Sequence, residues 1–275
     1  MTQRTILITG CSSGIGLASA RIMAQRGWRV FATARTADDL DRLRTINGVV
    51  PVPLEMRDDA SIAACATTVL ESCGGRLDAL FNNAGFGQVG AVEDVTSDQL
   101  RDQLQVNLIG VHALTRHVMP AMRRVGTGRI VMCSSVLGFA AAPYRGAYCA
   151  SKFALEGLTD ALRLELRGSG ISVSLIEPGP IATRFVETAL AHFRAKIDIE
   201  ASPHREDYLR RLASMERGGK NAFKLQPEAV AAKLVHAVES ARPRRRYYVT
   251  VPTYVAAFAR RVLPGGLLDH FLYKN

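Results

Sequence analysis

Apolar residues follow two alternating arrangements along the chain. Runs of five to seven mostly apolar residues predict strands at 5–9, 28–34, 49–54, 78–82, 129–134, 171–176 and 247–251. Segments with helical spacing of apolar positions lie between them, at 14–26, 58–72, 97–123, 147–167 and 227–240. Because several strand candidates are apolar throughout, we expect both of their faces to be covered. Strands that alternate with helices are typical of a parallel sheet between two helical layers.

The alternation is interrupted once, between the sixth and seventh strand candidates. Residues 184–226 hold two or three helix-like pieces there in place of one helix. We interpret this stretch as a helical insertion over the ligand-binding face of the sheet. The pattern therefore predicts an α/β fold with one doubly wound, Rossmann-type parallel sheet of about seven strands. We expect residues 1–275 to form a single domain, because no linker or internal repeat is visible.

Charge and composition narrow the function classes. The 275 residues are 48% hydrophobic and carry a formal net charge of +10. Residues 1–183 contain 18 basic and 16 acidic side chains, whereas residues 184–275 contain 17 and 9. The excess therefore belongs to the last third, and we interpret its densest run, 242–246, as a solvated turn. Nucleic-acid binding is not expected, because no basic stripe interleaved with aromatic residues is present.

Cysteine usage and the N-terminus predict a cytoplasmic protein. The five cysteines have neither disulfide-framework nor metal-site spacing, and we interpret all of them as reduced thiols: Cys11, Cys65, Cys73, Cys133 and Cys149. The chain enters its first strand at once, which leaves no room for a signal peptide. No apolar run approaches the roughly 18 residues of a membrane-spanning helix. We expect no metal site, and interpret His192 and His204 as surface residues.

A glycine-rich turn follows the first strand. Gly10, Gly14 and Gly16 occur where a chain turns tightly into a helix and where backbone N–H groups can approach a diphosphate. At the end of the second strand, dinucleotide folds place an acid for NAD or an arginine for NADP. Here Arg35 follows the strand directly, so we predict NADP(H) over NAD(H). Asp38 and Asp39 keep the NAD alternative open.

Tyr148 and Lys152 are the candidate acid/base pair. Four residues apart on a predicted helix, they share one face. A neighbouring ammonium favours the phenolate and lowers the tyrosine pKa, which makes the phenol a plausible proton donor and acceptor. Ser134 and Ser135 end the fifth strand, at the sheet edge where ligands bind in open α/β folds.

Together these residues resemble the short-chain dehydrogenase/reductase family over the whole chain. The carrying motifs are Thr9-Gly10-x3-Gly14-Ile15-Gly16, Asn82-Asn83-Ala84-Gly85, Asn107, Ser135, Tyr148-x3-Lys152 and Pro178-Gly179. Segments 82–87, 148–158 and 174–180 resemble the branch of 17β-hydroxysteroid dehydrogenase type 1, the photoreceptor retinol dehydrogenases and bacterial relatives.

The resemblance implies a role for each motif residue. Tyr148 would exchange a proton with the carbonyl oxygen, Ser135 would polarise it, and Lys152 would hold the nicotinamide ribose. Asn107 would order a water that relays protons to Lys152. The cofactor would contact Gly10, Ser12, Ser13, Gly14, Ile15, Gly16, Arg35, Glu55, Met56, Asn83, Ala84, Gly85, Tyr148, Lys152, Pro178, Gly179, Ile181 and Thr183. Glu55 departs from the family's usual Asp or Asn.

An apolar substrate is expected. Apolar residues in the insertion and after Ser135 suggest a hydrophobic ketone, aldehyde or alcohol, although these residues equally suit packing of the insertion onto the body. The predicted substrate contacts are Ser135, Leu137, Tyr144, Tyr148 and Phe185. Residues 253–275 are basic and apolar, which predicts membrane contact, subunit contact or packing. A homodimer or homotetramer is implied through 97–123 and 147–167. The alternative function is a non-catalytic dinucleotide-binding redox sensor.

Overall fold

Seven parallel strands form one sheet in the part of the chain that the computed structural model describes, residues 3–216 and 223–274. They are β1 (Thr5–Ile8), β2 (Arg29–Ala34), β3 (Val49–Pro53), β4 (Ala79–Asn82), β5 (Gly128–Cys133), β6 (Ile171–Glu177) and β7 (Arg246–Tyr248). Their order is β3-β2-β1-β4-β5-β6-β7. The strand order reverses between β1 and β4, which places a ligand crevice at their carboxyl ends. The predicted doubly wound sheet is confirmed.

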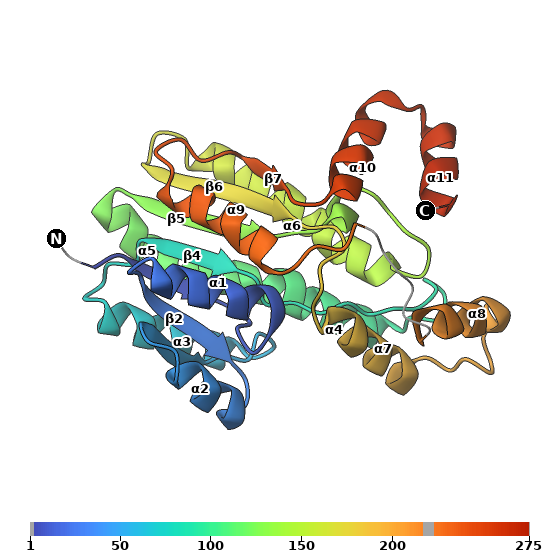
Figure 1. Cartoon of the computed structure of the whole chain (residues 1–275), viewed down its shortest axis with the longest axis horizontal. Helices are drawn as coiled ribbons and strands as arrows, with labels where there is room; N and C mark the ends of the chain where they lie inside the picture. Colours follow the sequence, from blue (N-terminus) through green and yellow to red (C-terminus); the bar gives the residue numbers. More distant parts are fainter. Residues whose placement is uncertain (1–2, 217–222, 275) are drawn as a thin grey trace.

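Helices cover both faces of this sheet (Figure 1). Their bounds are α1 (Gly14–Gln25), α2 (Ala37–Arg44), α3 (Asp59–Ser72), α4 (Ser97–Leu104), α5 (Gly110–Val125), α6 (Gly146–Glu165) and α9 (Glu228–Glu239). Successive side chains of a strand point to opposite faces. Leu7 of β1 accordingly enters the core shared with α3, α5 and α6, while Ile6 and Ile8 enter the core shared with α1 and α9. The uniformly apolar strands are thus buried on both faces, as predicted.

Three elements differ from the expected pattern. The helix predicted over 97–123 is interrupted by a π-helical turn, η1 (Gln105–Ile109), between α4 and α5. Helix α2 was not expected, because only three of its eight residues are apolar: Ala37, Leu40 and Leu43. The last strand ends at Tyr248 instead of residue 251. Val251 begins helix α10 (Val251–Val262), in which a proline occupies the first turn, where a missing N–H costs nothing.

The insertion lies beyond the carboxyl ends of the strands (Figure 1). It contains α7 (Phe185–Lys196) and α8 (Arg205–Glu216), and residues 217–222 lie outside the described part. Phe193, Ile197 and Tyr208 form a small separate core with Ala91. These three side chains therefore pack the insertion onto the body of the protein. This was the alternative to an apolar substrate lining for these residues.

The C-terminal segment forms two helices, α10 and α11 (Gly265–Lys274), that project from the same end of the molecule (Figure 1). Within the described residues, no helix is both long and apolar enough to cross a membrane. The run 242–246 precedes β7, whereas α10 follows it. The last residue of the run, Arg246, is also the first residue of β7.

Candidate active site

The glycine-rich turn has a backbone that only glycines permit. Gly10 and Gly14 have φ values of +71° and +55°, in the left-handed region that side chains disfavour. A Cβ on Gly16 would lie 2.2 Å from the carbonyl oxygen of Gly10. Ser13 is the N-cap of α1, but its side chain makes no capping bond. The first N–H groups of α1 therefore remain available, and this cradle fits a dinucleotide diphosphate.

Thr9 ties this turn to the segment after β4. Its hydroxyl accepts hydrogen bonds from the backbone N–H groups of Asn83 and Ala84, both at 2.9 Å. The Asn83 amide in turn donates to the Thr9 carbonyl at 2.8 Å. Residues 83–85 are thereby held beside Gly10, and their predicted contact with the adenosine ribose of the cofactor stays a prediction. The fastening role of Thr9 was not predicted, although its place at the end of the first strand could have indicated it.

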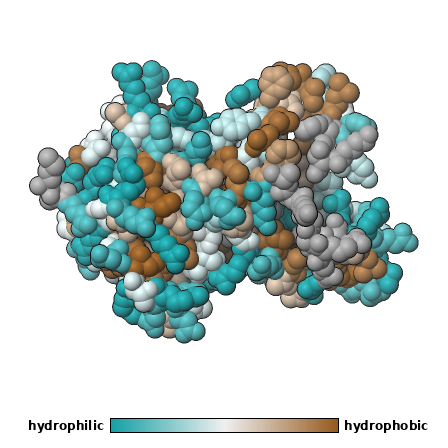
Figure 2. Space-filling model, in the orientation of Figure 1, coloured by the Kyte–Doolittle hydropathy of each residue, from teal (hydrophilic) through white to brown (hydrophobic). Residues whose placement is uncertain are grey.

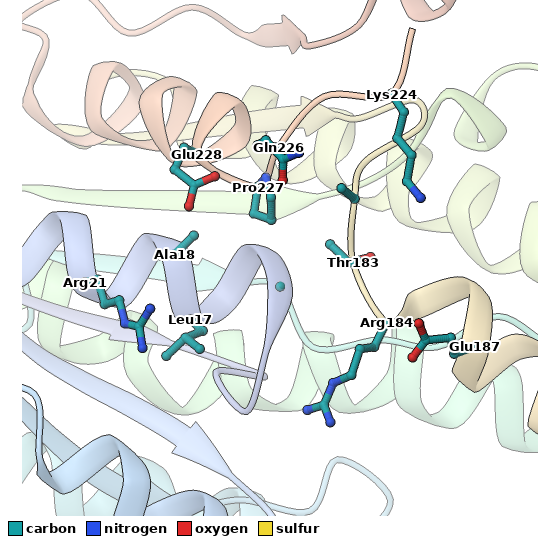
Figure 3. Close-up of a pocket in the computed structure, with 12 residues that line it drawn as sticks. Leu17, Ala18, Arg21, Thr183, Arg184, Glu187, Lys224, Gln226, Pro227 and Glu228 are labelled. Carbon is teal, nitrogen blue, oxygen red and sulfur yellow. The ribbon is translucent and has the colours of Figure 1, made fainter. Parts of the chain in front are cut away.

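A pocket of about 510 Å³ opens beside the start of α1 (Figure 3). Gly14 and Thr183 lie at its inner side, and the basic side chains of Arg21, Arg184 and Lys224 line it together with Glu187 and Glu228. Arg184 reaches the carbonyl oxygen of Ser12 at 3.5 Å. The first residue of the insertion therefore touches the glycine-rich turn, so the insertion and the diphosphate cradle are joined directly.

The predicted catalytic residues meet at the carboxyl end of β5. Ser135 follows the strand and begins the short turn η2 (Val136–Gly138), while Tyr148 and Lys152 lie on one face of α6. Each of the three is less than a tenth exposed. The Ser135 hydroxyl lies near enough to the Tyr148 phenol to lower its pKa. Two neighbouring hydroxyl groups can bind the same carbonyl oxygen, which is the arrangement expected of a proton donor and its polarising partner.

Burial sets the protonation state of this group of residues. It raises the pKa of the Tyr148 phenol above its ordinary value, against the lowering effect of the nearby Ser135 hydroxyl. It also lowers the pKa of the Lys152 ammonium. Lys152 Nζ donates to the Cys133 carbonyl at 2.7 Å and lies 5.8 Å from the centroid of the Tyr148 ring. Desolvation therefore dominates the pKa of the phenol, and a lowering of that pKa by Lys152 stays a prediction.

Asn107 lies in the π-helical turn and is fully buried. Its Oδ1 accepts from the N–H of Phe86 at 3.1 Å, and its Nδ2 donates to the Phe86 carbonyl at 2.9 Å. Nδ2 also donates to Ser151 Oγ at 3.2 Å, and that hydroxyl donates to the Tyr148 carbonyl at 2.7 Å. Asn107 is thus linked to α6 through Ser151, a residue that the sequence did not single out. The relay water implied for Asn107 remains a prediction.

The segment after β6 closes the crevice from the other side. Gly179 lies so close to Thr250 that a Cβ would be 2.1 Å from its hydroxyl oxygen. Thr183 lies against Gly14, at 2.9 Å from the position of a Cβ there. Ile181 is buried and forms an isolated bridge with Leu225. The predicted nicotinamide segment, Pro178 to Thr183, is therefore brought next to the glycine-rich turn.

The residues predicted at the adenosine end separate into two kinds. Arg35 is exposed and lies 3.9 Å from Glu55, so its guanidinium remains accessible to a phosphate. Asp39 accepts a hydrogen bond from Thr36 at 2.8 Å and pairs with Arg42. Asp39, one of the two acids that kept the NAD alternative open, therefore already has partners in and next to helix α2. Met56 is buried at the edge of the core, and its predicted contact with the cofactor stays a prediction.

The predicted substrate residues are not equally well placed. Phe185 meets the Tyr148 ring edge to face, with ring centroids 5.5 Å apart, and lies over Gly87. The Leu137 N–H donates to Ser135 Oγ at 3.1 Å, which places Leu137 at the catalytic serine. Tyr144 instead donates its hydroxyl to Asp207 of α8 at 2.6 Å. The structure uses this tyrosine to hold the insertion, because α8 supplies a carboxylate within its reach.

Comparison with known proteins identifies the family. A model described as short chain dehydrogenase matches residues 4–192. The chain belongs to the short-chain dehydrogenase family. The chain is similar in sequence to an uncharacterized oxidoreductase of Escherichia coli K12, YbbO. The two are 42% identical, over 98% of this chain and 94% of that protein. Human 17-beta-hydroxysteroid dehydrogenase type 1 is 35% identical over 91% of this chain and 78% of that protein. The chain is an oxidoreductase of this family, in the predicted branch.

Solved structures agree with this short-chain dehydrogenase assignment. A variant of actinorhodin polyketide ketoreductase, solved with NADPH, has a TM-score of 0.74 and 31% identity, over 90% of this chain and 95% of that chain. A family member from Burkholderia phymatum, solved with NAD, has a TM-score of 0.78 and 28% identity, over 94% and 92%. Short-chain dehydrogenases with this fold therefore bind NAD or NADP, and the activity of the family depends on such a cofactor.

Proposed function

We propose that the protein is an NADP(H)-dependent oxidoreductase that interconverts a hydrophobic ketone or aldehyde and its alcohol, with Tyr148 as the acid and base. The observation that carries this proposal is the burial of Ser135, Tyr148 and Lys152 together at the carboxyl end of β5, beside a cradle that fits a dinucleotide. The nicotinamide cofactor, when bound, supplies the hydride. A redox sensor, the alternative function, has no need of a positioned proton donor.

The chain's own residues then orient the substrate and move the proton. During reduction Ser135 hydrogen-bonds the carbonyl oxygen, and Tyr148 donates its proton to that oxygen as negative charge develops on it. Lys152, held at the Cys133 carbonyl, offers its remaining N–H groups to the cofactor ribose. Phe185, at the edge of the Tyr148 ring, excludes water from this side.

An activity screen with a tyrosine variant tests this proposal. We expect NADPH-dependent reduction of at least one compound among steroid ketones, retinal, medium-chain aldehydes and aromatic ketones. Tyr148→Phe removes the donated proton and should abolish turnover while NADPH binding persists. Tyr254→Phe, a change at an exposed tyrosine of α10, is the control and should leave the rate unchanged. Full turnover by Tyr148→Phe would exclude this mechanism, and no reduction of any compound would exclude the substrate class.

The preference for NADP(H) rests on Arg35. Its accessible guanidinium is loosely paired with Glu55, and Asp39 is engaged by Thr36 and Arg42. A ribose 2′-phosphate would give Arg35 a stronger, charge-assisted partner. We expect Arg35→Gln to weaken NADPH binding by about tenfold, the equivalent of one exposed charged hydrogen bond, and to leave NADH binding unchanged. Equal effects on the two dissociation constants, measured by fluorescence titration, would refute the assignment.

We further propose that helix α10 attaches the protein to an anionic lipid surface. Its outward face carries Val251, Val255, Phe258 and Val262, at the i, i+4, i+7 and i+11 positions of one stripe, and Phe258 is 67% exposed. Figure 2 shows this hydrophobic patch above the level of the sheet. The helix contains no acidic residue. Of the two arginines in its last turn, Arg260 donates to the Phe139 carbonyl, whereas Arg261 is exposed. An apolar stripe with an exposed arginine at its end matches the interface of an acidic bilayer.

Vesicle flotation tests this lipid contact. The wild type should float with phosphatidylserine vesicles and not with phosphatidylcholine vesicles. The double change Val255→Ser and Phe258→Ser should abolish flotation. Leu209→Ser serves as the control, because Leu209 is about as exposed as Val255 but lies on α8. If the double variant instead changes only the oligomeric state measured by light scattering, the stripe binds a second copy and the lipid proposal is wrong.

The remaining proposals concern assembly and location. We propose a homodimer or homotetramer formed through α4–α5 and α6. Ile109 and Leu164, which are exposed on these elements, support this surface, and light scattering of the wild type tests it. All five cysteines are free thiols, which confirms their predicted state and supports the proposed cytoplasmic location.

A further inference from the structure

Arg246 does not lie in a solvated turn, as its place in the basic run predicted. Its guanidinium lies between strand β6 and helix α6. One nitrogen donates to Glu177 at 2.6 Å and also to Glu156, while the other donates to Asp160 at 2.7 Å. Three carboxylates from two elements therefore converge on a single arginine of β7. The planar guanidinium suits such a cluster, because it presents several donors in a fixed arrangement.

The cluster is buried where it meets the two elements. Glu177 is fully buried and Glu156 nearly so, while Arg246 is about a quarter exposed. Burial, reinforced by the nearby Glu156, raises the pKa of Glu177 to about 8. A buried carboxylate is costly unless it is paired. The single guanidinium therefore joins β6 to α6 through Glu177 and Glu156, and its loss would leave the two elements without this connection.

The two buried glutamates are directly joined to catalytic segments. Glu156 lies one helical turn after Lys152 on α6, the helix that also carries Tyr148. Glu177 is the last residue of β6 and immediately precedes Pro178, where the predicted nicotinamide segment begins. The bonds of Arg246 thus link the helix that carries the acid/base to the strand that aims the cofactor segment.

We propose that Arg246 is a positioning residue of the reductase. By binding Glu156 and Glu177 together, it fixes the catalytic face of α6 relative to the segment that begins at Pro178. This inference rests on the proposed oxidoreductase mechanism, because the register between phenol and nicotinamide has a role only in hydride transfer. Arg246 itself touches neither the phenol nor the glycine-rich turn, so it acts through the two elements that it connects.

Two variants and a matched control test the proposal. Arg246→Gln removes the connection but leaves buried carboxylates without a partner. A triple variant, Arg246→Met with Glu156→Gln and Glu177→Gln, removes the connection without leaving an unpaired buried charge, and should fold for that reason. Asp160 keeps its partner Arg163 in both variants. The control is Arg245→Gln, the same change of charge at the exposed neighbour in the run.

Cysteine alkylation supplies a measurement that needs no substrate. Cys149 is buried next to Tyr148 on α6, whereas Cys65 is buried on α3. If α6 loses its position, iodoacetamide should label Cys149 at least about tenfold faster in both variants, while the rate at Cys65 stays at the wild-type value. Mass spectrometry of the labelled peptides follows the two sites in one sample. Arg245→Gln should label like the wild type.

Kinetics on the best carbonyl substrate complete the test. Because a small misplacement of reacting groups costs about 100-fold, kcat should fall by about that factor in both variants, while the dissociation constant for NADPH stays within about threefold. Wild-type kcat with a protected Cys149 in the triple variant would overturn the proposal. Equal acceleration of labelling at both cysteines would also overturn it, since Arg246 would then only stabilise the fold. If the wild type reduces no carbonyl, the proposed function fails and the labelling still decides the role of Arg246.

Discussion

Tyr208 fastens the insertion helix α8 to the loop after β4. Its side chain is 2% exposed, and its hydroxyl accepts from the N–H of Ala91 at 2.6 Å and donates to Asp94 at 2.5 Å. Tyr208→Phe removes both bonds and keeps the ring, which still meets Phe193 at 4.9 Å. The change therefore isolates the hydrogen bonds from the packing.

The expected loss follows from these two partners. The Ala91 amide becomes an unpaired buried donor, which costs about 1–3 kcal/mol. Asp94 loses one charge-assisted hydrogen bond but still accepts one from the Ser202 hydroxyl at 2.6 Å. We therefore add about 1 kcal/mol for Asp94 to the cost of the unpaired Ala91 amide. The sum, about 2–4 kcal/mol, corresponds to a roughly 30-fold to several-hundred-fold increase in local opening.

Hydrogen exchange of the native protein measures this opening. Protection of amides in α7 and α8 should fall by the stated factor in Tyr208→Phe, while amides of β4 and β5 keep their wild-type protection. Tyr144→Phe is the comparison, because its hydroxyl binds the exposed carboxylate of Asp207 and should matter less. Equal protection in Tyr208→Phe and the wild type would refute the reasoning. Equal loss in the insertion and the sheet would show that the insertion does not open by itself.

Three further predictions concern the cradle, the core and the buried carboxylates. Gly16→Ala places a Cβ 2.2 Å from the Gly10 carbonyl, so the turn must shift and NADPH affinity should fall at least about tenfold in a fluorescence titration; unchanged affinity would contradict this. Leu114→Ala, at a fully buried site, should lower the free energy of unfolding by about 2–5 kcal/mol in urea, whereas Val125→Ala at an exposed site should change it by less than about 0.5 kcal/mol. Glu177 has a folded-state pKa of about 8, above its ordinary value of 4.5, so the folded state binds more protons than the unfolded state between these values. The free energy of unfolding of the wild type should therefore fall as pH rises through this window. Relative to the wild type, the free energy of unfolding of Glu177→Gln should rise by up to about 1.4 kcal/mol per pH unit, measured by thermal melts. A constant difference between the two proteins across that window would show that Glu177 is ionised throughout.

The sheet, and the burial of Tyr148 and Lys152 on one face of α6, could be predicted because their signals are local. An apolar run can be recognised without knowledge of the segments that pack against it. Residues four apart on a helix always share a face, so the pairing of Tyr148 with Lys152 follows from the spacing alone. The π-helical turn at Asn107 carries no comparable signal, since it depends on contacts with Phe86 and Ser151. The apolar pattern therefore predicts one long helix over 97–123, with no interruption at this turn.

The environment of charged residues was the least predictable feature. Arg246 belongs to a run that is typical of exposed turns, yet its acidic partners lie 69 to 90 residues away in the chain. Tyr144 similarly follows the catalytic serine in sequence but binds Asp207, 63 residues further on. Spacing reveals partners only within one element, and these contacts arise when separate elements pack together.

In the proposed mechanism, the burial of Tyr148 affects the two directions of the reaction differently. Desolvation favours the neutral phenol and so keeps the proton on Tyr148. Reduction of a carbonyl would use that proton directly. Oxidation of an alcohol would first require a base that accepts the phenol proton from a buried site.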